Sequence, residues 1–337
     1  MGAIGAPGTV PDDPEALAAL LDDQGYLADD GAATACFLAL RMQRPLFLEG
    51  DAGVGKTELA RALAGVLGAP LIRLQCYEGI DASQALYDWD HPRQLLHLRA
   101  VQASGSAPGG AEELEAGMYD RRYLRARPLL RALEESAPGR PAVLLIDEID
   151  RADDEFEAFL LEFLSDFAIS VPELGTVRAA APPAVVLTSN RTREVHDALK
   201  RRCLYHWMPH PSFEREAAII ARRRPEAAER LVREVAAAAQ RLRDPAASGI
   251  DLLKPPGVAE TIDWTAALTA LGATALDPGA AARTLGALVK HRDDVDAVRD
   301  RLSALLNGGG AGADTAAGAA PAPVAEPTAD TAARTRP

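Results

Sequence analysis

Cysteine is scarce in this chain, and long hydrophobic runs are missing. The 337 residues include three cysteines, Cys36, Cys76 and Cys203, at wide spacing, a pattern that argues against a disulfide framework and indicates a reducing compartment. No apolar run approaches the roughly 18 residues that a membrane-spanning helix needs. The N-terminus also shows no basic segment followed by a hydrophobic one. We therefore expect a cytoplasmic protein with no membrane span.

A surplus of positive charge is missing as well. The chain has 36 Lys and Arg against 49 Asp and Glu, which gives a formal net charge of -13. Because phosphate backbones favour a basic protein face, we expect no nucleic acid as a main partner. Hydrophobic residues make up 48% of the chain and charged residues 25%, which is typical of a globular protein with room for about two domains.

The strongest motif present is a phosphate-binding loop of the form G-x-x-x-x-G-K-[ST]. A short buried strand is predicted over 45–49 and a helix over 58–67, so the motif has the strand, turn and helix that it requires. Backbone N–H groups of such a loop point at phosphate oxygens, and the helix N-terminus adds positive charge. The alternative is a glycine-rich turn that merely precedes a helix. The motif predicts ATP and Mg²⁺ as ligands, and its residues are Gly50, Asp51, Ala52, Gly53, Val54, Gly55, Lys56 and Thr57.

Two acids follow a continuous apolar run over 142–146, Asp147 and Glu148. Continuous apolarity predicts a strand covered on both faces, as in a parallel sheet. At the carboxyl end of that strand Asp147 is placed to hold magnesium through water, as Thr57 is with its hydroxyl. Glu148 is placed to orient and deprotonate an attacking water. The alternative is that both acids only cap the next helix.

A further strand, predicted over 184–190, ends in Asn190, whose amide could position the water or sense the γ-phosphate; turn formation is the alternative. A helix over 195–202 ends in Arg201 and Arg202. These arginines either complement the helix dipole or project into the nucleotide site of a neighbouring subunit.

A fifth strand is predicted over 203–208. Cys203, His206 and His210 faintly resemble the spacing of a metal site. Residues 203 and 206 would point to opposite faces of that strand, which argues against zinc there.

The rest of the chain predicts a core followed by helices. Residues 1–13 are expected to be flexible. Other expected elements are helices over 14–22, 30–42, 123–136 and 156–167, a strand over 71–75, a helix cap at 81–84 and a hairpin over 168–179 that turns at 172–175. Residues 212–306 show only helical patterns. Residues 307–337 consist mainly of Ala, Gly, Pro and Thr, which predicts a disordered tail.

The segments GDAGVGKT, LLIDEID, LTSN and ALKRRC, in this order and spacing, resemble the AAA+ ATPases and, within them, the MoxR family. The likeness is closest to CoxD-type members through QCYEGIDASQALYDWDHPRQLLHLRA, TSNRTREVHDALKRRCLYHW and KPPGVAETIDW. The resemblance implies an α/β P-loop NTPase core over 14–211 with a parallel five-stranded sheet. It also implies a small all-α lid domain over 212–306 and a ring, usually hexameric, with ATP between neighbours.

The resemblance also implies residue roles. Lys56 contacts phosphates, Asn190 is the first sensor, and an arginine finger reaches across the subunit interface. Arg202 is the first candidate for the finger and Arg201 the second. Many relatives carry an Arg near the start of a lid helix as a second sensor, where this chain offers Lys254, with Arg283 as another candidate. The hairpin and an insertion around Trp89 match substrate-handling insertions of the family.

The function implied is that of an ATP-hydrolysing, ring-forming chaperone that remodels a client protein or inserts a metal or cofactor into it. For CoxD-like members the client is a molybdenum hydroxylase of the carbon monoxide dehydrogenase type, and a von Willebrand A domain protein is the usual partner. Two alternatives stay open on the residues: a small-molecule P-loop kinase, and a non-catalytic ATP-dependent switch or scaffold.

Overall fold

A five-stranded parallel sheet forms the centre of the molecule. The computed structural model describes residues 11–104, 117–172 and 175–307. The strands follow the order β2-β5-β8-β1-β9, and each pairs with its neighbours in parallel. The predicted parallel five-stranded sheet is therefore confirmed. Its strands are β1 (Leu46–Glu49), β2 (Leu71–Gln75), β5 (Val143–Asp147), β8 (Ala184–Ser189) and β9 (Leu204–Trp207).

Helices cover both faces of this sheet, as crossover connections between parallel strands require. One set is α1 (Pro14–Asp23), α2 (Asp30–Met42) and α3 (Lys56–Val66); the other is α7 (Pro128–Glu135), α8 (Asp154–Asp166) and α9 (Asp197–Arg202).

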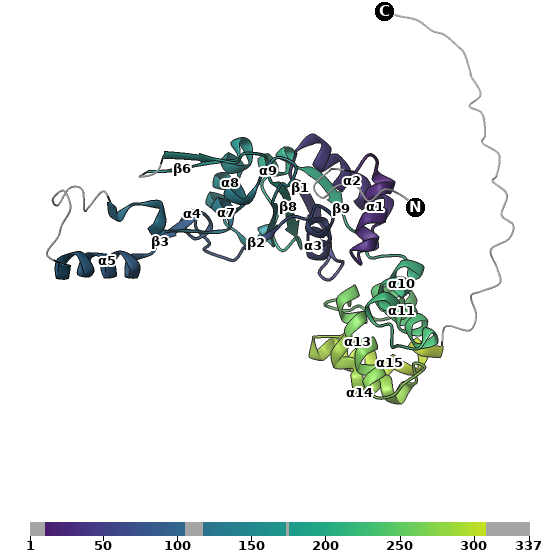
Figure 1. The fold of residues 1–337 in the computed structure, drawn as a ribbon. Coiled ribbons are helices and arrows are strands. Elements are labelled where there is room, and N and C mark those ends of the chain that lie inside the picture. The colour runs from purple at the N-terminus through teal and green to yellow at the C-terminus, as the bar shows by residue number, and fades with distance from the viewer. Residues whose placement is uncertain (1–10, 105–116, 173–174, 308–337) are drawn as a thin grey trace, which may run out of the picture.

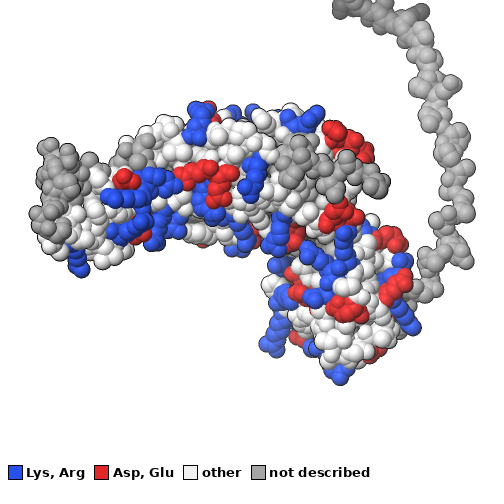
Figure 2. All heavy atoms as spheres, viewed as in Figure 1, with Lys and Arg blue, Asp and Glu red and all other residues white. Residues whose placement is uncertain are grey.

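Charged side chains of both signs lie interspersed over the surface shown in Figure 2. None of the described helices is long and apolar enough to cross a membrane.

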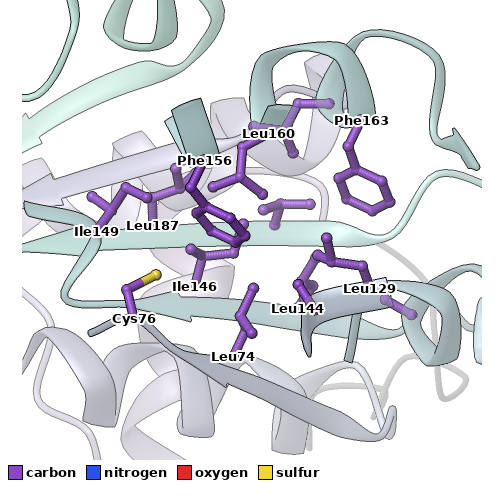
Figure 3. Close-up of a cluster of buried hydrophobic side chains, with 14 of the residues drawn as sticks. Leu74, Cys76, Leu129, Leu144, Ile146, Ile149, Phe156, Leu160, Phe163 and Leu187 are labelled. Carbon is purple, nitrogen blue, oxygen red and sulfur yellow. The ribbon is translucent and has the colours of Figure 1, made fainter. Parts of the chain in front are cut away.

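Strand β5 shows why both faces are covered. All five of its residues are buried, and successive side chains of a strand point to opposite faces. Val143 and Leu145 pack with α1, α2 and α3 in one apolar cluster. Leu144 and Ile146 pack in the other, together with side chains of α7 and α8 such as Leu129 (Figure 3). Asp147 is thereby brought to the carboxyl edge of a strand that cannot shift without exposing apolar surface.

An arm extends from the sheet between β2 and α7 (Figure 1). It contains α4 (Ala82–Leu86), β3 (Tyr87–Trp89), α5 (His91–Ser104), η1 (Arg121–Tyr123) and β4 (Leu124–Ala126), and β3 and β4 are antiparallel. The predicted cap is confirmed, because Asp81 and Gln84 form a capping box at the start of α4. The helix predicted over 123–136 is wrong over 123–127. Pro128 favours the first helical position and disfavours helical backbone at the residue before it.

The predicted hairpin is confirmed as β6 (Ala168–Val171) paired antiparallel with β7 (Gly175–Arg178). Part of its predicted turn, residues 173–174, lies outside the described residues.

The region after β9 is helical, as predicted. It packs around a separate apolar cluster that includes the fully buried Trp264. The domain boundaries given above remain predictions. Residues 1–10 of the expected flexible segment 1–13, and residues 308–337 of the expected tail 307–337, lie outside the described residues. The helices are α10 (Phe213–Arg223), α11 (Glu229–Arg243), α12 (Pro245–Ser248), α13 (Val258–Ala270), α14 (Pro278–Leu288) and α15 (Arg292–Asn307).

Candidate nucleotide site

The phosphate loop connects β1 to α3 in a conformation that depends on glycine. Gly55 has φ +100°, in the left-handed region that side chains disfavour. A Cβ on Gly50 would lie 2.4 Å from the carbonyl oxygen of Met208. Lys56 is buried and its Nζ donates to the carbonyl oxygens of Gly50 and Asp51, both at 2.7 Å. Burial lowers the pKa of Lys56, although nearby acids, Asp150 first, act to raise it.

Asp147 meets the loop at the start of α3. Its side chain is 4% exposed, and its Oδ1 accepts from the hydroxyls of Thr57 at 3.1 Å and Thr188 at 2.6 Å. Arg73, on the neighbouring strand β2, donates from Nε to Oδ2 at 2.9 Å. Thr57 and Asp147, predicted to share magnesium, are thus side by side. Thr188 and Arg73 were not among the predicted site residues, because the sequence does not show that their strands flank β5.

Glu148 is held away from an ordinary backbone conformation. Its φ of +57° lies in the left-handed region, which costs about 1–3 kcal/mol for a residue other than glycine and is concentrated at functional sites. The N–H of Glu148 donates to the Thr188 hydroxyl at 2.9 Å. Its carboxylate accepts from Gln75 Nε2 at 3.1 Å and pairs with Arg151 Nε at 3.0 Å. Strand and loop contacts therefore fix both the backbone and the carboxylate of Glu148.

Asn190 follows β8 and lines the same cavity. Its backbone N–H donates to Oδ1 of Asp150 at 3.2 Å. The other carboxylate oxygen of Asp150 accepts from the backbone N–H and the hydroxyl of Thr192 at 2.9 and 2.7 Å. Asp150 is itself buried, so it fixes the loop that presents Asn190. Asp150 was not among the predicted site residues, which included only the first two acids of the motif.

These side chains line a cavity of about 310 Å³. Its lining combines polar groups of the phosphate loop, Asp147, Glu148 and Asn190 with apolar side chains. N–H donors and apolar side chains in one cavity match the phosphates and base of a nucleotide. The apolar side chains are those of Leu27, Val54, Ile219, Val258 and Ile262.

Helix α10 contributes two cations to the cavity, Arg215 and Arg223. Arg223 Nη2 pairs with Glu58 at 2.8 Å, and Arg215 Nε donates to the carbonyl oxygen of Leu27 at 2.9 Å. Neither arginine was among the predicted site residues. The sequence nevertheless carries a signal for them, since residues 215, 219 and 223 repeat every four positions and so share one helix face.

Lys254 does not line this cavity, and neither does Arg283. Lys254 is exposed, and its backbone N–H donates to Oδ2 of Asp294 at 3.2 Å. Arg201 and Arg202 also lie outside the cavity, exposed at the end of α9. Their side chains have no ion-pair partner among the residues that the structure describes.

Cys203, His206 and His210, whose spacing faintly resembles that of a metal site, do not form one in the part of the chain that the structure describes. Cys203 is buried, and burial raises the pKa of its thiol to about 12. His210 Nε2 lies 3.3 Å from Oδ2 of Asp51 in the phosphate loop. Over residues 11–104, 117–172 and 175–307, no group of three or more His, Cys, Asp or Glu side chains could hold a metal ion.

A phosphate loop at the end of β1, an acid at the end of β5 and a cavity closed by a helical region define a P-loop nucleoside triphosphatase with the AAA+ fold. Residues 45–203 match the family model of the AAA domain, dynein-related subfamily. The matched segment contains the phosphate loop, both acids and Asn190. Residues 45–203 therefore carry an AAA domain.

Midasin and RuvB are two of the known proteins to which this chain is similar. Over 48 residues it is 50% identical to midasin from Giardia intestinalis, a segment that makes up 14% of this chain and 1% of midasin. Among solved structures, the Thermotoga maritima RuvB Holliday junction branch migration motor is similar with a TM-score of 0.43 and 16% identity, over 75% of this chain and 66% of RuvB. A proline-to-glycine mutant of that RuvB gives a TM-score of 0.45 and 15% identity, over 85% of this chain and 76% of the mutant.

Proposed function

We propose that this protein hydrolyses ATP as a homo-oligomeric ring, usually hexameric, in which each copy completes the nucleotide site of its neighbour and ATP turnover remodels a client protein. The observation that carries the proposal is the division of the catalytic groups. The phosphate loop and both acids meet in one cavity, whereas Arg201 and Arg202 lie exposed outside it. The arginine finger that stabilises the charge of the transition state would therefore come from a second copy of the chain.

The residues of one copy bind and hydrolyse ATP as follows. Lys56 and the loop N–H groups hold the β- and γ-phosphates, and Asn190 positions the attacking water. Glu148 accepts a proton from that water as its oxygen bonds to the γ-phosphorus and the bond to the β–γ bridging oxygen breaks. Orthophosphate and ADP are the products. Of the cations from the C-terminal helices, Arg223 and Arg215 line the cavity, which favours them over Lys254 as the second sensor.

The site also fits Mg²⁺. The Thr57 hydroxyl and Asp147 carboxylate lie 3.1 Å apart, and oxygen donors are what Mg²⁺ prefers. Thr57 and Asp147 would hold the ion, which would neutralise negative charge on the β- and γ-phosphate oxygens.

Self-association is supported by apolar surface beside α9. Strand β9 is at the edge of the sheet, and two of its aromatic side chains, Tyr205 and Trp207, are 52% and 37% exposed. Leu38 on α2, 41% exposed, lines a shallow hollow with Tyr205. Exposed edge strands and apolar patches are features of surfaces that pair with another chain. The arginines of α9 directly precede this strand.

For the client, the resemblance to CoxD-type MoxR proteins supports maturation of a molybdenum hydroxylase with a von Willebrand A domain partner. The arm carries exposed apolar side chains suited to contact a client, Leu95, Leu96 and Tyr119. This assignment is an analogy, because substrates are set by sites grafted on a fold rather than by the fold.

The experiment that tests the proposal measures phosphate release from ATP per subunit over a range of protein concentrations, without an added acceptor. We expect turnover per subunit to rise with concentration and then level off as rings form. Arg202→Ala should assemble but lose about 10³-fold in turnover. Turnover that is independent of concentration, together with an unimpaired Arg202→Ala variant, would overturn the shared site. A requirement for a small-molecule acceptor would instead indicate a kinase.

A further inference from the structure

Arg44 lies at the junction between α2 and β1, and it holds the end of a different helix, α9. Its Nη2 donates to the carbonyl oxygen of Arg201 at 2.8 Å and to that of Cys203 at 3.2 Å. Its Nε donates to the carbonyl oxygen of Arg202 at 3.2 Å. The last carbonyls of a helix have no partner within the helix. One guanidinium therefore supplies donors to three consecutive carbonyls.

The backbone of Arg44 is itself fixed. Its N–H donates to the carbonyl oxygen of Ala39 in α2 at 3.0 Å, and the carbonyl oxygen of the next residue, Pro45, accepts from Leu204 at 2.8 Å. Strand β1 begins at Leu46 and leads directly into the phosphate loop. Arg44 thus ties α9 to the strand that carries the nucleotide site of its own chain.

Helix α9 needs such a tie because it has only six residues, and short helices are not stable without tertiary contacts. Its start is held by Glu157, whose Oε2 accepts from the backbone N–H of His196 at 2.7 Å. Its last two residues are Arg201 and Arg202. A reacting group displaced by about 1 Å can lower a rate about 10²-fold, so the angle at which α9 ends matters to any site that these arginines enter.

The charges at this end of α9 are not neutralised within the described chain. Lys200, Arg201, Arg202 and Arg44 have no acidic partner among the residues that the structure describes. Four cations close together repel one another, although the helix C-terminus offsets part of this. An anionic group from outside the chain would complete the cluster.

We propose that Arg44 is a positioning residue that fixes the end of α9 so that Arg202 and Arg201 reach the nucleotide bound to a second copy of this chain. The inference rests on the proposed trans role of these two arginines. A purely structural role, in which Arg44 only caps α9 for its own fold, is the competing explanation.

Single variants give the first measurement. Arg44→Ala should lower ATP turnover of the assembled protein about 10- to 100-fold. The Kd for ATP should stay within about twofold of that of the unaltered protein, because Arg44 does not line the nucleotide cavity. Arg44→Lys keeps the charge but loses the fork of donors, and it should fall between Arg44→Ala and the unaltered protein.

Arg41→Ala is the matched control. Arg41 is three residues away on α2 and lies over the Phe37 ring of its own helix. The described part of the chain shows no hydrogen bond or ion pair from Arg41 to α9, so turnover should be unchanged.

Rings assembled from two variants distinguish an effect of Arg44 on the site of a neighbouring subunit from an effect on the site of its own subunit. Glu148→Gln subunits have an inactive site but an intact α9, whereas Arg44→Ala subunits have an intact site and a misplaced α9. In a head-to-tail ring of equal amounts, about half of the Arg44→Ala sites face an intact neighbour. Turnover per Arg44→Ala subunit should therefore rise several-fold above that of the variant alone.

The same mixture with Arg201→Ala/Arg202→Ala identifies which idea fails. Rescue of the double variant but not of Arg44→Ala overturns the positioning role of Arg44 alone. If neither variant is rescued, the proposed trans role of Arg201 and Arg202 is overturned, and the inference that rests on it fails as well. If Arg44→Ala does not fold, as judged by its thermal midpoint, the Arg44→Lys mixture decides by the same criterion.

Discussion

At the scale of single residues, the two acids after β5 are treated differently by the fold. Asp147 is buried and accepts hydrogen bonds from three other elements. Glu148 is partly exposed, has a left-handed backbone and faces the cavity. A buried, fully bonded carboxylate suits a fixed ligand, whereas an accessible one suits exchange of a proton with water.

Glu148→Gln tests that difference. The substitution preserves size but removes the proton acceptor, so we expect phosphate release to fall by about 10²- to 10⁴-fold. The Kd for ATP, measured by titration of a fluorescent analogue, should change little. Glu155→Gln, an exposed acid in the first turn of α8, is the control and should retain turnover. A scaffold that never hydrolyses ATP would show no turnover to lose.

His210 is expected to make the stability of the fold depend on pH. Burial, and then the charge of Arg243, lower the pKa of His210 below its ordinary value of 6.5. As pH falls from about 7 to 5, the unfolded chain therefore binds a proton at this position before the folded chain does, which favours unfolding. We expect the urea midpoint of the unaltered protein to fall more over this range than that of His210→Gln. Parallel pH profiles would contradict the expectation.

At the scale of elements, the helical region is joined internally by a buried ion pair. Glu216 on α10 and Arg243 on α11 have side chains 0% and 7% exposed, with Arg243 Nη1 2.6 Å from Glu216 Oε2. Thr261 on α13 also donates to Glu216, at 3.0 Å. Three helices are thus fixed around one carboxylate, next to the segment in which the N–H of Val258 donates to the carbonyl oxygen of Gly53 in the phosphate loop.

Glu216→Ala should destabilise this region strongly. It leaves the charge of Arg243 buried without its partner, a change that costs about 3–5 kcal/mol. Glu135→Ala is the control, because its pair with Arg131 is exposed and contributes less than about 0.5 kcal/mol. Urea unfolding followed by circular dichroism measures both. Equal and small effects would show that the buried network does not hold these helices together.

At the scale of the whole molecule, the distribution of charge bears on possible partners. The net charge is -13, and Lys and Arg lie among Asp and Glu over the face in Figure 2. Even the arginine-rich segment 121–127, at the end of the arm, is partly neutralised by ion pairs. These pairs are Arg121–Glu134, Arg125–Asp90 and Arg127–Asp88. Paired arginines are poorly placed to replace the counterions of a phosphate backbone.

We therefore expect duplex DNA to change ATP turnover by less than about twofold, even at low salt where nucleic acid binding is strongest. The measurement compares phosphate release with and without plasmid DNA. An acidic protein of similar net charge serves as a non-specific control. A large stimulation by DNA that disappears at higher salt would contradict the expected absence of a nucleic acid partner.

The sequence by itself determined the sheet, the hairpin, the phosphate loop and the acids beside it. These features depend on local patterns: apolar runs define buried strands, and the loop needs glycines at fixed spacing. The helix predicted across 123–127 was wrong because β4 there pairs with β3, where Leu124 lies opposite Trp89, 35 positions earlier. Pairing at that separation leaves little trace in a local pattern.

Only the tertiary structure decided which side chains meet at the site. Arg73, Gln75 and Thr188 reach the acids because β2 and β8 flank β5, and strand order is not written in any one strand. Arg215 and Arg223 enter the cavity because α10 packs against the core, and Arg44 reaches α9 across 157 positions. Such contacts arise from packing between distant segments, so the sequence indicated the chemistry of the loop while the fold selected the residues that surround it.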